Sequence, residues 1–419
     1  MANTFTAVSG NTPLLQNSTS GTPTLSANSA TAVNGLTSRW SAHAPIRHAA
    51  NGGGTAGANF TFTQQWQALG TYYGYRLIYA NYGTSALTLD LSKAAGVPTD
   101  LHTGVGATFV SGPSGLSIPT GFNINAGAGK DFVPGLAMSD LIIQSSVART
   151  DFPSENPLLQ TRSYFSGAGT MGQINNTANA ELFTTYGWRF AANTNSGDQV
   201  TTITAQTPSR AGNWLQPVGV DFYYDKPAVS IVDCQDSLFR GRVTNVDTEG
   251  FSALAHRVCA IKRASNSNKI WSPSTFSVSG QLYKASSLTA KQIASVMKPD
   301  YLLVRDWSVN TTNNQANVDE SWALLVDLVE TCRRNGVQII IGTTGMSTGN
   351  IEPALGRIRA QNARLLTLRN AGAIVVDIVS IAYDPATGLP LAGATADGTH
   401  LTETYAQLVA AAFAAAIPD

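Results

Sequence analysis

The spacing of apolar and polar positions divides the chain into two differently built parts. From about residue 59 to 225, short β-branched and aromatic runs are separated by Gly, Pro and Ser turns, without helical spacing between them. Residues 71–80 and 86–91 flank Asn81-Tyr82-Gly83-Thr84, a pattern that predicts a hairpin. Many short strands without intervening helices predict an all-β sandwich or jelly-roll domain.

From residue 226 onward, strand patterns alternate with helical patterns. Short apolar runs predict strands at 228–233, 276–279, 301–307, 337–341 and 373–379. Helical spacing covers 251–261, 319–334 and 402–416, a capping box begins at Thr289, and a further helix follows Pro353. Five strands in βα alternation predict an α/β domain with a flavodoxin-like, five-stranded parallel sheet.

The first 58 residues are rich in Ser, Thr, Asn, Ala and Gly, which is typical of a polar N-terminal arm. The expected organisation is therefore an arm at 1–58, a β-sandwich domain at 59–225 and an α/β domain at 226–419. Such an arm becomes ordered only by packing on its own domain or on a neighbour. We therefore expect a homo-oligomer or a virion assembly held through this arm.

Composition narrows the classes of partner. The 26 basic residues balance the 26 acidic ones, and no Lys/Arg cluster appears, so we expect neither nucleic-acid nor membrane binding. The three cysteines are widely spaced and form neither a disulfide framework nor a metal-ligand pattern, so no metal or cofactor is expected. No signal peptide is present as the sequence is written; we expect an extracellular or virion-associated protein.

Polar residues follow four of the predicted strands, at what would be one edge of the sheet. They are Ser237 after the first strand, Gly280 after the second, Asn310 after the third, and Asp397 and His400 after the fifth. A hydroxyl, an imidazole with a carboxylate three residues earlier, an unhindered backbone N–H and a carboxamide are the groups that acyl transfer requires.

The order and spacing of these residues resemble the SGNH (GDSL-type) serine hydrolases. Asp236-Ser237-Leu238 is similar to the nucleophile block, and Asp397-Gly398-Thr399-His400-Leu401 fits the last block without a change. Many members of that family carry an N-terminal β domain. The resemblance implies that Ser237 is the nucleophile, His400 the base and Asp397 its orienting group. It further implies an oxyanion hole made by Ser237, Gly280 and Asn310.

Two blocks depart from the family pattern. The glycine that normally precedes Asp-Ser is Gln235 here, and the usual Gly-x-Asn-Asp is Ser308-Val309-Asn310-Thr311. A side chain at Gln235 is expected to crowd the turn or to line the substrate pocket. Trp307 and Ser347 are the other candidates for lining that pocket.

A rival nucleophile motif is present at Gly345-Met346-Ser347-Thr348-Gly349. It matches the Gly-x-Ser-x-Gly elbow of α/β-hydrolases, and Asp377 and His400 follow it in that family's order. An elbow requires the serine on a tight strand-to-helix turn, whereas three residues separate this motif's strand from it and only one strand follows. Ser347 is therefore interpreted as a loop residue beside the substrate cleft.

The sequence predicts a serine esterase that removes carboxylic esters, most simply O-acetyl groups, from a polysaccharide. The alternative is a catalytically degenerate SGNH domain in a structural or receptor-binding protein of a phage virion or tail. The tyrosines and Trp66 of the β domain could stack on sugar rings, but aromatic residues in paired strands more often pack on each other.

Overall fold

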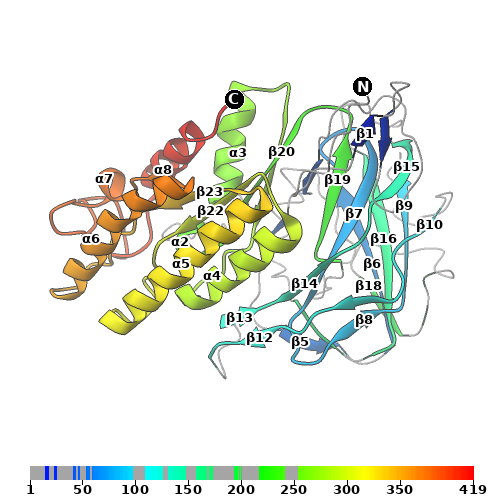
Figure 1. Ribbon diagram of the computed structural model, residues 1–419, viewed down its shortest axis with the longest axis horizontal. Helices are drawn as coiled ribbons and strands as arrows, with labels where there is room; N and C mark the ends of the chain where they lie inside the picture. Colours follow the sequence, from blue (N-terminus) through cyan, green and yellow to red (C-terminus); the bar gives the residue numbers. More distant parts are fainter. Residues whose placement is uncertain are drawn as a thin grey trace.

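The computed structural model describes residues 59–97, 109–125, 131–147, 157–167, 169–172, 193–196, 198, 200, 217–240 and 253–419, together with short strands in the first 56 residues. A β-rich unit lies beside an α/β unit (Figure 1). None of the helices in these ranges has the length and hydropathy needed to cross a bilayer.

The β-rich unit contains two five-stranded antiparallel sheets. The first has the order β10 (Val110–Ser111), β9 (Leu91–Val97), β16 (Leu158–Phe165), β6 (Phe60–Gln67) and β18 (Asn193–Ser196). The second has the order β14 (Gly135–Met138), β7 (Tyr72–Asn81), β19 (Gly219–Tyr224) and β3 (Ser41–His43), with β15 (Ile142–Val147) also paired to β7. This arrangement confirms the predicted all-β domain.

The two antiparallel sheets pack face to face through aromatic side chains. Tyr79 of β7 lies edge-on to Phe165 of β16, with ring centroids 6.2 Å apart, and its hydroxyl lies 3.1 Å from Ser163 Oγ. Trp66 of β6 is also fully buried. These rings form the sandwich core, so they are not free to stack on sugars.

The predicted hairpin between 71–80 and 86–91 is wrong. Strand β7 pairs with β14, β15 and β19, whereas β8 (Leu87–Leu89) pairs with β11 (Leu116–Ile118). The buried Asn81 side chain accepts a hydrogen bond from Gly83 N–H and donates one to the Ser85 carbonyl. These local bonds turn the chain away from β7 before β8 begins.

Further short strands complete the β-rich unit and connect the N-terminal segment to both units. The remaining two-stranded pairs are β1 (Leu15–Asn17) with β2 (Pro23–Leu25), β5 (Gly53–Ala56) with β17 (Gly169–Gly172), and β12 (Phe122–Asn123) with β13 (Phe132–Val133). Strand β3 joins the second antiparallel sheet through β19, and β4 (Ile46–Arg47) joins the parallel sheet through β21. The domain boundaries and assembly through the arm stay predictions.

The α/β unit is built on a parallel sheet in the predicted flavodoxin-like order. Its strands run β24 (Ile374–Val376), β23 (Gln338–Gly342), β22 (Tyr301–Arg305), β20 (Ala228–Asp233), β21 (Ile270–Thr275) and the short β4. Counted from β20, the five main strands have the spatial order 2-1-3-4-5. The strand order therefore reverses between β20 and β22, which is where sheets of this type bind their ligands.

Helices cover both faces of this sheet (Figure 1). They are α2 (Ser237–Arg240), α3 (Leu254–Ser265), α4 (Tyr283–Gln292) with a π-helical turn at Ile293–Met297, α5 (Gln315–Asn335), α6 (Ala354–Leu365) with a 3-10 turn at Leu366–Ala371, α7 (Val379–Ala382) and α8 (Glu403–Ala415). Adjacent strand residues point to opposite faces: Leu302 packs with α4 and α5, and Leu303 packs with α3 and α8.

The α4–α5 side of the sheet shares one continuous core with the β-rich unit. Leu282 N–H, just before α4, donates to Asp131 Oδ1 at 2.9 Å. Strand β19 ends at Tyr224 and β20 begins at Ala228, so the antiparallel sheet continues almost directly into the first parallel strand.

Two element boundaries differ from the sequence prediction in a way that affects the site. The second parallel strand is β21 at Ile270–Thr275, and the predicted strand at 276–279 lies after its end. The prediction missed this interior strand because its proline, Pro273, and its buried serines are residues typical of a turn. The second helix begins at Tyr283 and not at Thr289, because the buried Thr289 lies inside α4 instead of capping it.

Candidate active site

The turn after β20 places Ser237 at the start of α2. Cys234 N–H still donates to the Leu303 carbonyl of β22, which extends the strand pairing by one residue. Asp236 then accepts the Leu238 N–H on its carboxylate at 3.0 Å, as an N-terminal helix cap does. Asp236 is fully buried, and Arg305 Nη1 lies 3.7 Å from its Oδ1. The cap and this buried ion pair hold the serine at the end of its strand.

His400 connects Ser237 to Asp397 in a continuous chain of hydrogen bonds. His400 Nε2 lies 2.9 Å from Ser237 Oγ, and His400 Nδ1 lies 2.6 Å from Asp397 Oδ2. Both Ser237 and His400 are more than nine-tenths buried. The structure thus brings together three residues from the two ends of the α/β unit with the geometry of a nucleophile, a base and an orienting carboxylate.

Hydrogen bonds hold Asp397 in its charged form. Burial of part of the carboxylate raises its pKa, but hydrogen bonds from the His400 ring and from the N–H groups of His400 and Thr399 outweigh this and lower the pKa to about 2. The two N–H groups donate to Asp397 Oδ1 at 2.7 and 2.9 Å, which leaves Oδ2 for the imidazole. Asp397 therefore keeps Nδ1 of His400 protonated and Nε2 free to accept the serine proton.

A salt bridge between two helices supports the His400 segment from behind. Arg257 of α3 forms a bidentate pair with Glu403 at the first turn of α8, with distances of 2.5 and 2.7 Å. Helix α8 begins three residues after His400, so this pair fixes the helix that follows the turn 397–400. Neither residue could be identified from the sequence, because the two partners lie 146 positions apart.

The oxyanion-hole candidates follow β20, β21 and β22. Gly280 lies in the turn after β21 with φ +74°, a conformation that favours glycine. Among the hydrogen bonds of the described residues, none uses the N–H of Ser237 or Gly280 as donor. Asn310 Nδ2 lies 3.2 Å from Ser308 Oγ and 3.3 Å from the Gln281 carbonyl. Two unengaged N–H donors and one weakly held amide are thus present at these strand ends.

Ser308, which replaces the usual glycine of the third block, is the centre of a small network. Its Oγ lies 2.8 Å from Asp236 Oδ2 and 2.9 Å from the Gln281 carbonyl, and it accepts hydrogen bonds from both the backbone and side-chain N–H of Asn310. Ser308 therefore joins the nucleophile block to the Asn310 block. In the sequence alone, Ser308 is recognisable only as a departure from the family pattern.

Gln235 and Trp307 lie beneath the site and not on its open surface. Gln235 is 1% exposed; its Nε2 donates to the Trp307 carbonyl at 3.0 Å, and its Oε1 accepts from Ser286 Oγ. The Trp307 side chain is fully buried against Tyr283. This corrects the expectation that these two side chains line a substrate pocket. Both are buried and pack between the ends of β20 and β22.

Ser347 lies in a loop beside the turn 397–400. Its Oγ accepts a hydrogen bond from Thr399 Oγ1 at 2.9 Å, while His400 bonds to Ser237. Asp377, the acid of the rival arrangement, accepts from Thr343 Oγ1 at 3.0 Å. The elbow-like motif therefore does not assemble a second triad.

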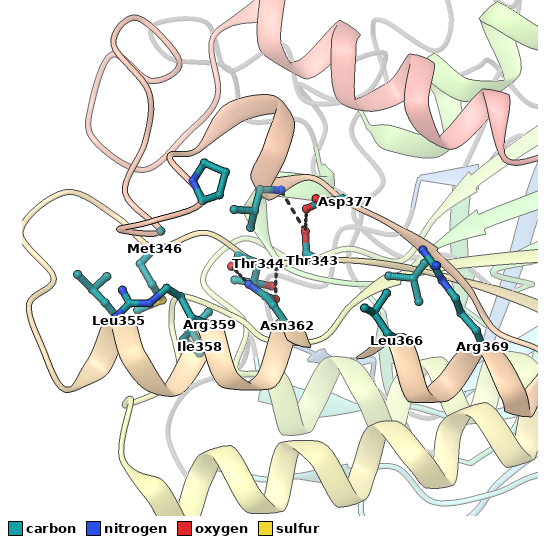
Figure 2. A pocket seen from close by; sticks show the side chains of 14 residues that line it. Thr343, Thr344, Met346, Leu355, Ile358, Arg359, Asn362, Leu366, Arg369 and Asp377 are labelled. Atoms are coloured by element: carbon teal, nitrogen blue, oxygen red, sulfur yellow. Dashed lines mark hydrogen bonds between the residues drawn. The ribbon is translucent and has the colours of Figure 1, made fainter. Parts of the chain in front are cut away.

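A separate cavity of about 250 Å³ opens where β23 and β24 end (Figure 2). Thr343, Met346 and Asp377 line it together with side chains of α6, and none of Ser237, Asp397 and His400 does. In the described part of the chain, no three or more His, Cys, Asp or Glu side chains gather as metal ligands would.

Comparisons with known proteins find similarity only in structure. No family model and no curated protein matches the chain. A GDSL-like lipase from Bacteroides thetaiotaomicron is 15% identical and covers 44% of this chain and 86% of its own, with a TM-score of 0.34. An acetylxylan esterase from Geobacillus stearothermophilus is 16% identical and covers 44% and 92%, also with a TM-score of 0.34. A lipase/acylhydrolase from Enterococcus faecalis is 17% identical and covers 45% and 94%, again with a TM-score of 0.34. What the structure itself shows is the flavodoxin-like strand order of the α/β unit, which agrees with the α/β fold that the sequence predicts.

Proposed function

We propose that this protein is a serine esterase that hydrolyses carboxylic esters through Ser237, His400 and Asp397. The observation that carries the proposal is the continuous hydrogen-bond chain from Ser237 Oγ through the imidazole to Asp397, with 2.9 and 2.6 Å between the heavy atoms. A structural domain has no need of a buried serine hydroxyl bonded to an imidazole whose other nitrogen is held by a carboxylate.

In the proposed reaction, Ser237 Oγ attacks the ester carbonyl carbon and passes its proton to His400 Nε2. The negative charge that develops on the carbonyl oxygen is received by the N–H groups of Ser237 and Gly280 and by the Asn310 amide. His400 then protonates the departing alcohol. Water, deprotonated by His400, attacks the acyl-serine, and the carboxylic acid leaves as Ser237 regains its proton.

The substrate class we propose is an O-acetylated polysaccharide. The support is compositional: only 12% of residues are charged, so uncharged residues such as Ser, Thr and Asn account for much of the polar character of the chain. The buried aromatic residues of the β-sandwich give no support to sugar stacking there. Acetate release from O-acetylated and chemically deacetylated samples of the same polysaccharide tests this step separately from ester hydrolysis.

Hydrolysis of p-nitrophenyl acetate by wild type and by Ser237→Ala tests the reaction itself. We expect activity in wild type and a loss of several orders of magnitude in the variant. Ser380→Ala is the matched control, because Ser380 Oγ donates only to the Asp377 carbonyl outside the triad. Equal activity in wild type and Ser237→Ala would remove Ser237 from the nucleophile's role.

The alternative, a degenerate domain in a receptor-binding or virion protein, predicts a different result. Such a protein would not form a covalent adduct with a fluorophosphonate probe. The proposed esterase forms one on Ser237, and peptide mapping by mass spectrometry locates it. The observation that favours the esterase is the alignment of Ser237 Oγ with His400 Nε2 at 2.9 Å.

A further inference from the structure

The loop that contains the elbow-like motif, residues 345–349, contacts the catalytic turn, residues 397–400, directly. Thr399 Oγ1 donates to Ser347 Oγ at 2.9 Å, and Thr348 N–H donates to the Gly398 carbonyl at 2.8 Å. Thr348 Oγ1 lies 3.4 Å from the same carbonyl. Both residues between Asp397 and His400 are therefore held by this loop.

The contact is close as well as polar. Gly398 has φ +79°, and a Cβ added there would lie only 1.9 Å from Thr348 Oγ1. Position 398 therefore requires a glycine, both for its backbone angle and because Thr348 leaves no room for a side chain. The turn and the loop pack closely at this point. A shift of the loop would move the turn.

The loop 345–349 is anchored in the hydrophobic core through Met346. Met346 is 4% exposed and packs in a cluster with Trp307, Leu355 and Ile358, beside α6 (Figure 2). Met346 N–H also donates to the Gly388 carbonyl at 2.9 Å. Ser347 and Thr348 thus extend from a residue anchored in the core.

The catalytic turn has less support of its own. The side chain of Asp397 is 38% exposed, and Gly398 and Thr399 are only partly buried. The N–H groups of Thr399 and His400 hold the Asp397 carboxylate, so the path of the backbone here sets the direction of both the carboxylate and the imidazole. Whatever fixes Gly398 and Thr399 consequently fixes the alignment of the triad.

We propose that Ser347 and Thr348 are positioning residues that clamp the turn 397–400 and so hold His400 in line with Ser237. The proposal rests on the esterase function proposed above. It gives the elbow-like motif a role: its serine is a hydrogen-bond acceptor for the catalytic turn and not a nucleophile.

A double-mutant cycle of Ser347→Ala and Thr399→Val on p-nitrophenyl acetate hydrolysis tests the clamp. Each change removes one end of the hydrogen bond, so each single variant is expected to lower kcat about three- to ten-fold, with KM little changed. The double variant should lose no more than either single one, because the same bond is already absent. Unchanged kcat, or losses that multiply in the double variant, would overturn the proposal.

A second readout keeps this test separate from the esterase proposal. The Nδ1 proton of His400, bonded to Asp397, should give a strongly downfield NMR signal that disappears in His400→Gln. We expect this signal to exchange faster with water in Ser347→Ala and in Thr399→Val than in wild type or the control Ser380→Ala. An inactive wild type with the faster exchange would refute the esterase and retain the clamp. An active wild type with unaltered exchange and kcat in both variants would refute the clamp alone.

Discussion

Replacing Asp306 by Asn should make the free energy of unfolding less dependent on pH, because Asp306 is a carboxylate buried behind the candidate site. It follows β22 directly and is fully buried. Its Oδ1 accepts from Thr344 Oγ1 at 2.5 Å, and its Oδ2 has no hydrogen-bond partner among the described residues. Burial raises its pKa from 3.8 to about 6, although the Thr344 bond and the charge of Arg305 act in the opposite direction.

The magnitude follows from linkage between protonation and folding. The folded pKa lies about two units above the unfolded value, so the folded state binds more protons than the unfolded one between about pH 4 and pH 6. The contribution of Asp306 to stability is therefore complete below about pH 4 and is lost as pH rises through 6. Two pKa units correspond to about 3 kcal/mol. An asparagine at this position does not titrate, so the Asp306→Asn variant does not lose this stability as pH rises.

Urea unfolding followed by tryptophan fluorescence measures the effect at pH 4 and at pH 7. We expect the free energy of unfolding of Asp306→Asn, relative to wild type, to rise by about 3 kcal/mol between these two pH values. All other titrating groups are common to both proteins and cancel in the difference. Ser380→Ala serves as a control that should show no such change. A difference between Asp306→Asn and wild type that stays constant from pH 4 to pH 7 would refute the reasoning.

Three further changes address the site itself. Asn310→Ala should lower kcat by about 10²- to 10³-fold while KM changes little, as steady-state kinetics will show, because an oxyanion donor acts mainly in the transition state. Asp397→Asn should lower kcat on the order of 10⁴-fold. The charged Asp397 carboxylate stabilises the fold above about pH 4, and this contribution is lost as pH falls toward 2. The melting temperatures of wild type and Asp397→Asn should therefore converge over that range. Gln235→Leu should destabilise the fold by about 1–3 kcal/mol in urea unfolding, because the buried Trp307 carbonyl loses its 3.0 Å hydrogen bond and keeps only the long one from Thr344 Oγ1. Esterase activity per folded molecule should be retained.

The sequence predicted the parts of this molecule in which local pattern and structure agree. The apolar runs of β20, β22 and β23 are buried on both faces, so their composition alone identifies them as interior parallel strands. Ser237 and His400 could be placed because parallel strands present their carboxyl ends at a single edge, and residues that follow such strands meet there. The order of strands then determines which ends are neighbours.

The sequence could not predict features whose causes lie in distant partners. Strand β21 contains Ser272, Pro273 and Ser274, which look like a turn until the strands on either side pair with it. The ion pair of Arg305 with Asp236 likewise joins two charges that look like solvated residues in the sequence. Their burial becomes visible only when β20 and β22 lie side by side.

The two departures from the SGNH pattern, at Gln235 and Ser308, have the same structural consequence. Gln235 follows β20 and bonds to the Trp307 carbonyl after β22, and Ser308 follows β22 and bonds to Asp236 after β20. Both substitutions thus tie together the two strand ends between which the strand order reverses, where the candidate site lies. Buried polar side chains at such positions are costly unless they are hydrogen-bonded. Here each added side chain is buried and hydrogen-bonded to the neighbouring strand end, so both departures are accommodated by bonds that connect the segments carrying Ser237 and Asn310.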